Sequence, residues 1–315
     1  MDNIWNIIVK ADKKWVITSI LMGFTAIVAR GLRWSNLLEP MGYFPKKWNN
    51  IHAVSLSYFV SMAIPRSGEL VRCTAINQVE DIPVDKLFGT VILERVIDTS
   101  ILLLFVGLAF LLNYDVFSSL IERVSAETGT SSEPGTGSLI FWLCGVVISA
   151  GIAIIAFRKK ILASKIGQKI SDFLLGMKEG FSSILKMKKR WQFVFYSVII
   201  WGMYYLSMLV MLKALHLEPF GWNEALFLVV AGGLGVIIPT PNGLGSYHFL
   251  VQHGVIVLAS TYAVWPEISD AAISERGAAL ATLQWSAQTG MMIIAGLVAT
   301  IAFALQRKKL NVKPQ

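Results

Sequence analysis

Eight ionisable side chains lie within or directly beside apolar segments that are long enough to cross a bilayer. Burying an ion in a membrane costs several kcal/mol unless the ion is paired or hydrated, so such residues point to a function. Five arginines stand against three carboxylates, and a net-cationic site at this depth suits an anionic ligand such as a phospholipid head group. These candidate binding residues are Arg30, Arg33, Arg66, Glu69, Arg72, Glu94, Arg95 and Asp98.

The first group, Arg66, Glu69 and Arg72, has its charges three residues apart. A helix would bring them close to one face, where Glu69 could bridge both guanidinium groups. The planar fork of arginine binds two phosphate oxygens at once. The alternative is a salt bridge at an exposed helix end, which would contribute little to stability. The helix-breaking Pro65 beside the group favours the binding role.

The second group, Glu94, Arg95 and Asp98, lies inside an apolar run. At the rise of an α-helix these groups would lie about 10–16 Å deep. Glu94 and Asp98 share a helix face, and Arg95 is spaced to reach Asp98. One negative charge is then left over, so we expect a further arginine from another element. A protonated carboxyl group that carries a proton, and a purely structural ion pair between helices, are the alternatives.

A third candidate is the loop from Pro239 to Ser246. Gly243 and Gly245 allow close approach of the backbone, and Ser246 is a suitable N-cap for the apolar run that follows. The free N–H groups and positive dipole of a helix start can bind an anion. His248 follows the loop, but its spacing to the next histidine is not that of a metal site. We therefore predict no metal ligands, no catalytic residues and no cofactor.

The composition places these groups in a membrane protein. Hydrophobic residues make up 55% of the 315, charged residues only 15%, and the mean hydropathy is +0.60. The sequence predicts an all-α polytopic protein with about eight transmembrane or re-entrant helices, forming one domain over 1–315. The net charge of +8 fits contact with an anionic inner leaflet and needs no nucleic acid. The eight apolar runs are 15–38, 51–65, 87–112, 139–157, 191–213, 224–239, 246–263 and 277–305.

The distribution of lysine and arginine predicts the orientation. If 51–65 crosses the membrane, most cations fall on one side, which places both termini in the cytoplasm and the protein in the cell (inner) membrane. Residues 158–190 read as an amphipathic cytoplasmic segment at the membrane surface, and 306–315 as a basic cytoplasmic tail. Whether 224–263 crosses twice or forms a re-entrant hairpin stays open. Short segments interrupted by proline and glycine favour a transporter binding site.

Four motifs together resemble the lysylphosphatidylglycerol synthase/flippase-type transmembrane family, found in the membrane region of the bacterial multiple peptide resistance factor. The resemblance covers about 5–305 and implies a helical, flippase-like domain with a hydrophilic cavity. Because the sequence ends at Gln315 after a short tail, the transferase of two-domain members, and its synthase activity, are not expected. Asn242 and His248 replace a glycine and an acidic residue of the family pattern. The motifs are Arg30-x-x-Arg33-Trp34, Pro65-Arg66-Ser67-Gly68-Glu69-x-x-Arg72, Glu94-Arg95-x-x-Asp98 and Pro239-x-Pro241-x-Gly243-x-Gly245.

Three functional hypotheses follow. The first is a non-enzymatic protein that binds and translocates an anionic or aminoacylated phospholipid, or a lipid-linked head group. The second is an accessory membrane subunit that anchors or feeds a separate transferase or glycosyltransferase. The third, an intramembrane enzyme using Ser246, has little support because no catalytic triad is visible. Membrane phospholipid is the expected partner, and the sequence leaves a transferase subunit and homo-oligomerisation open.

Overall fold

The computed structural model describes residues 2–65, 67–119, 187–238 and 240–312, with side chains from Ile4 to Lys308 within those ranges. Every regular element in these ranges is helical, as the fold class predicted. The predicted run 139–157 and all but the end of the segment 158–190 lie outside the described residues. The elements are α1 (Asp2–Val9), α2 (Lys13–Leu38), η1 (Glu39–Met41), α3 (Lys47–Ala63), α4 (Gly68–Glu80), α5 (Val84–Leu112), α10 (Arg190–Ala214), α11 (Trp222–Ile237), η2 (Pro241–Gly243), α12 (Ser246–Thr261) and α13 (Asp270–Val312).

Four of the described helices are long and apolar enough to cross a membrane: α2 with η1, α5, α10 and α13. They bury only part of their apolar surface against one another, because lipid covers the outer face of such a bundle. The exposed side chains of α13 are accordingly large and apolar, among them Ile294, Leu297 and Ile301. The protein is therefore a helical membrane protein, as its composition indicated.

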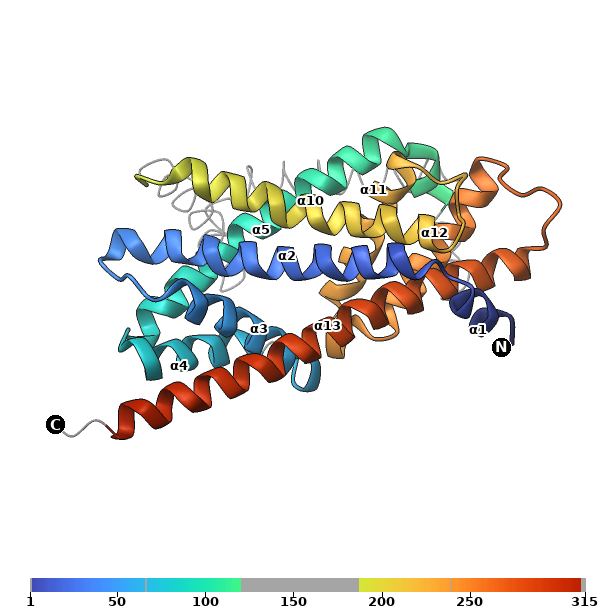
Figure 1. Cartoon of the computed structure of the whole chain (residues 1–315). Helices are drawn as coiled ribbons and strands as arrows, with labels where there is room; N and C mark the ends of the chain where they lie inside the picture. The colour runs from blue at the N-terminus through green and yellow to red at the C-terminus, as the bar shows by residue number, and fades with distance from the viewer. Residues whose placement is uncertain (1, 66, 120–186, 239, 313–315) are drawn as a thin grey trace, which may run out of the picture.

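The helices α2 and α10 lie side by side and run in opposite directions (Figure 1). The backbone N–H of Asp12 donates to the carbonyl of Ala214, which joins the start of α2 to the end of α10. At the other end Lys189 pairs with Glu39 at 2.8 Å. We call the end with residues 9–13, 214–221 and 262–270 the N-terminal end. The end with residues 39–47, 81–86, 187–190 and 306–308 is the C-terminal end.

The helices α3 and α4 form a hairpin that enters and leaves at the C-terminal end. The backbone N–H of Lys46, before α3, donates to the carboxylate of Glu80, the last residue of α4. A Cβ atom at Gly68 would overlap the carbonyl of Ser57, so the two arms pack backbone to backbone at the tip. The chain turns back between α3 and α4, so 51–65 belongs to one arm of a hairpin and not to a single crossing helix as predicted.

The helices α11 and α12 form a second hairpin, which enters from the N-terminal end. The rings of Phe220, before α11, and Trp265, after α12, are 5.3 Å apart. Gly232 and Gly235 lie against Tyr247 so closely that a Cβ atom at either position would overlap it. Residues 224–263 are thus two helices packed as a hairpin, and whether this hairpin crosses the membrane twice or re-enters stays open. The tips of the two hairpins meet, since η2 contacts α3.

The described chain thus contains two halves with the same order of helices. A long helix, a hairpin of two short helices and a second long helix make up α2–α5, and the same order recurs in α10–α13. Because α2 and α10 are antiparallel and the hairpins enter from opposite ends, the halves are related as an inverted repeat. The two ends of the chain lie at opposite ends of the bundle (Figure 1). This arrangement does not fit the expectation that both termini lie on one side of the membrane.

Candidate functional site: a buried arginine network

Three arginines and two carboxylates form one buried network near the C-terminal end, and we call it the arginine network. Glu94 receives Arg30 at 3.1 Å and Arg33 at 3.0 Å on Oε1, and Arg72 at 2.7 Å on Oε2. Asp98 lies 2.6 Å from Arg30 and 2.7 Å from Arg33. None of the five side chains is more than 9% exposed. The predicted arginine donors from other elements are thus Arg30, Arg33 and Arg72.

Helical spacing on three elements builds this network. Arg30 and Arg33 are one turn apart near the end of α2, and Glu94 and Asp98 are one turn apart on α5. Arg72 comes from α4, the returning arm of the first hairpin. That arm reaches α5 because the hairpin folds back at Gly68. Arg72 therefore joins the network only when the first hairpin is packed into the bundle.

Aromatic rings and a serine hold the guanidinium groups in place. Arg72 lies over the ring of Trp34 at 4.7 Å, and the Trp34 indole N–H donates to Thr90 at 2.8 Å. Cations are attracted to the face of an aromatic ring, most strongly when both are removed from water. Arg33 lies over Phe193 of α10 at 5.4 Å and donates to Ser197 at 3.1 Å.

Sequence reasoning missed these supporting residues. Trp34 is adjacent to Arg33, but it was noted only as part of a motif. Phe193 and Ser197 are more than 150 positions from the arginines that they contact, so no spacing rule could have paired them.

The arginine network carries one excess positive charge, since three guanidinium groups face two carboxylates. The Nε–H groups of Arg30, Arg33 and Arg72 are buried and have no acceptor among the described residues. A buried donor without an acceptor is costly, so these three groups favour the binding of an acceptor. An anion with several oxygen atoms would supply both the charge and the acceptors.

The predicted pairing of Arg95 with Asp98 is wrong. Arg95 points instead to α4, where its Nε pairs with Glu69. The oxygens of Asp98 are taken by Arg30 and Arg33, and Arg95 projects from a different face of α5. The Arg95 and Glu69 side chains remain 47% and 31% exposed, so this pair is accessible, unlike the arginine network. Arg66, the remaining predicted arginine, lies outside the described residues.

Residues 240–246 of the predicted loop form the tip of the second hairpin and are not part of the arginine network. Gly243 and Gly245 have φ of +71° and +86°, which favour glycine. Ser246 is not the N-cap, because Gly245 holds that position. The Ser246 hydroxyl instead donates to the carbonyl of Gly235 at 2.7 Å and ties the two arms together. His248 lies against the ring of Trp285 at 5.4 Å.

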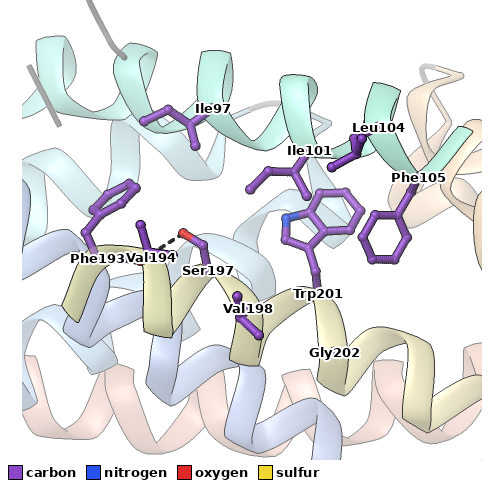
Figure 2. Close-up of a pocket in the computed structure, with 10 residues that line it drawn as sticks. All are labelled: Ile97, Ile101, Leu104, Phe105, Phe193, Val194, Ser197, Val198, Trp201 and Gly202. Atoms are coloured by element: carbon purple, nitrogen blue, oxygen red, sulfur yellow. Dashed lines mark hydrogen bonds between the residues drawn. The ribbon is translucent and has the colours of Figure 1, made fainter. Parts of the chain in front are cut away.

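An apolar pocket of about 570 Å³ lies between α5 and α10, beside the arginine network (Figure 2). Figure 2 shows the indole of Trp201 facing Ile101 and Phe105 across it. Ser197 lines the same pocket and also accepts the hydrogen bond from Arg33. A guanidinium-rich polar site and a hydrocarbon-lined space are therefore next to each other, which is the arrangement that an amphiphilic ligand requires.

The fold and the site define a helical membrane protein with an inverted repeat and a buried, net-cationic network. The lysylphosphatidylglycerol synthase TM region family matches residues 1–265, and the chain belongs to this family. Similar proteins include UPF0104 membrane proteins of Methanocaldococcus jannaschii, 26% identical over 263 residues (78% of this chain, 75% of the relative), and of Pyrococcus horikoshii, 24% identical over 260 residues (73% and 76%).

The glycosyltransferase AglD of Haloferax volcanii is 25% identical over 266 residues. The match covers 75% of this chain but 42% of that protein. No solved structure gives a significant match.

Proposed function

We propose that this protein binds the phosphate of an anionic membrane lipid at the arginine network and carries the lipid head group across the membrane. The observation that carries the proposal is the excess positive charge of the network together with its three unpartnered, buried Nε–H groups. Charged groups inside a membrane domain mark the path of an ionic substrate more often than they serve stability. The proposed role is transport rather than catalysis.

The fold supports movement of a ligand past this network. Inverted repeats with broken helices bind their substrate where the two halves meet, and transport by rocking one half against the other. Here η2, at the tip of the second hairpin, contacts α3 of the first. The pocket between α5 and α10 would take an acyl chain while the phosphate lies at the network. The exposed Arg95 would contact the head group on its way in.

The distribution of charge gives the proposed orientation. Among the described side chains, the C-terminal end carries eight lysines and arginines against three carboxylates, whereas the N-terminal end carries two against four. Positively charged ends of membrane proteins remain in the cytoplasm. We therefore place the C-terminus in the cytoplasm, the N-terminus outside, and the arginine network nearer the inner leaflet of the cytoplasmic membrane.

A transport assay in liposomes tests the proposal. Reconstituted protein should make fluorescent anionic lipids in the inner leaflet accessible to dithionite, and zwitterionic lipids more slowly. Arg95→Gln should slow this exchange about tenfold while the melting temperature holds, because an accessible ion pair adds little stability. Lys86→Gln, an exposed cation at the start of α5, is the control and should keep the wild-type rate. Folded protein that moves no lipid would rule the function out.

A second candidate function is an accessory subunit of a glycosyltransferase. The similarity to AglD favours this function. AglD is a glycosyltransferase, and the matched region makes up only 42% of its length. In that case the purified protein should be inactive in liposomes, and its removal from cells should abolish transfer of a sugar to a membrane lipid. Capture of a glycosyltransferase from native membranes, together with inactivity of the isolated chain, would favour this function over transport.

A further inference from the structure

A second buried polar site lies in the other half of the repeat. Its four members, Ser19, Ser207, Gln284 and Gln288, are called the polar cluster here. The hydroxyl groups of Ser19 and Ser207 are 2.8 Å apart, and Gln284 donates to Ser207 at 2.9 Å. Gln288 donates to Ser19 and to Ser207, each at 3.2 Å. None of the four side chains is ionisable.

The polar cluster occupies the place in the second half that the arginine network occupies in the first. Arg30 is the eighteenth residue of α2, and Ser207 is the eighteenth residue of α10. Glu94 and Asp98 are four residues apart on α5, the long helix after the first hairpin. The same separation recurs between the two glutamines of α13, the long helix after the second hairpin: Gln284 and Gln288.

Each site also contains one serine from the opposite half of the repeat. Ser197, the eighth residue of α10, accepts from Arg33 in the arginine network, and Ser19, the seventh residue of α2, belongs to the polar cluster. Each half therefore lends one serine to the site of the other half. The correspondence indicates that the two sites are counterparts under the inverted repeat, one charged and one neutral.

Two tyrosines, Tyr58 and Tyr204, lie between the two sites. The guanidinium of Arg30 lies 6.0 Å from the ring of Tyr58, and the Tyr58 and Tyr204 hydroxyl groups are 3.4 Å apart. Tyr204 is one turn from Ser207 on α10. From Arg30 to Ser19 the rise along α2 is about 16 Å, close to half the hydrocarbon thickness of a bilayer. The two sites are thus about half a membrane thickness apart.

One member of the polar cluster, Gln288, retains an amide oxygen that could accept a hydrogen bond from a ligand. Gln288 is only partly buried, and no hydrogen bond to its Oε1 is present in the described ranges. This oxygen lies over Gly23, where a Cβ atom would overlap it. Beside it, Thr289 receives a hydrogen bond from Asn242 at the tip of the second hairpin. An amide oxygen, amide N–H groups and hydroxyl groups pair well with the hydroxyl groups of a ligand.

We propose that the polar cluster is a second head-group site, and that it selects an anionic lipid whose head group is uncharged and rich in hydroxyl groups, such as phosphoglycerol or a phosphosugar. The inference rests on the function proposed above, since the phosphate is first held at the arginine network. A head group with an ammonium ion would find no carboxylate in the polar cluster. A bare phosphate would find no fixed positive charge there.

Three fluorescent lipids in the liposome assay test this selection: phosphatidylglycerol, phosphatidic acid and lysyl-phosphatidylglycerol. The wild-type protein should move phosphatidylglycerol about tenfold faster than the other two, corresponding to one or two hydrogen bonds made only by its hydroxyl groups. Gln288→Met should lower the phosphatidylglycerol rate to that of phosphatidic acid and leave the phosphatidic acid rate unchanged.

Ser207→Ala, which removes a hydroxyl group without adding volume, is the second variant and should act in the same direction. Gln306→Met is the matched control, since Gln306 hydrogen-bonds Asn49 at the C-terminal end and should not affect selection. Equal wild-type rates for the three lipids, or variants that slow every lipid by one factor, would overturn the second site and leave the proposed function standing. Absence of transport of all three by folded wild-type protein would overturn both.

Discussion

Removing the charge of Glu94 should destabilise the protein more than any other single change in the arginine network. Glu94 is fully buried and its two oxygens receive three arginines at 2.7–3.1 Å. Glu94→Gln would leave three guanidinium groups with only Asp98 and would turn an amide N–H toward one of them. Breaking a buried ion pair in this way costs about 3–5 kcal/mol. We expect the melting temperature in detergent to fall by at least about 5 °C.

The double variant provides the sharper measurement. Arg72 pairs within the network only with Glu94, so Glu94→Gln with Arg72→Gln leaves two arginines and one carboxylate, the same excess charge as in the wild type. The double variant should melt above Glu94→Gln, with a coupling of about 1–3 kcal/mol. Arg95→Gln is the control, because its pair with Glu69 is accessible. Strictly additive losses, or a Glu94→Gln variant as stable as wild type, would show that the site is hydrated and not a closed network.

Two further predictions concern the first hairpin and the orientation. Gly68→Ala should cost about 1–3 kcal/mol, since its Cβ atom would overlap Ser57 and force the arms apart; Gly89→Ala, with open space around it, should melt near the wild type. A green fluorescent protein fused to the C-terminus should fluoresce, and an N-terminal epitope should be reached by antibody added outside intact spheroplasts; protection of that epitope would contradict the proposed orientation.

The sequence predicted which residues form the site better than it predicted which of them pair with one another. Charges within apolar runs identified Arg30, Arg33, Arg72, Glu94 and Asp98, because a charge at that depth is costly whatever the fold. The pairing failed at Arg95, which helical spacing assigned to Asp98. Spacing along one helix shows which residues share a face, but not which neighbouring helix covers that face. The position of α4 assigned Arg95 to Glu69.

The sequence by itself determined that this protein is a bundle of membrane helices with arginines inside it. Hydrophobicity and charge are local properties of a segment, and they decide whether that segment is stable in lipid. Only the tertiary structure decided that 51–65 belongs to a hairpin, and that the chain ends lie at opposite ends of the bundle. A hairpin and a crossing helix of this length have similar composition. They differ in whether Glu80 returns to Lys46, a contact between residues 34 positions apart. The inverted repeat, and with it the pairing of a charged and a neutral site, depends on such contacts.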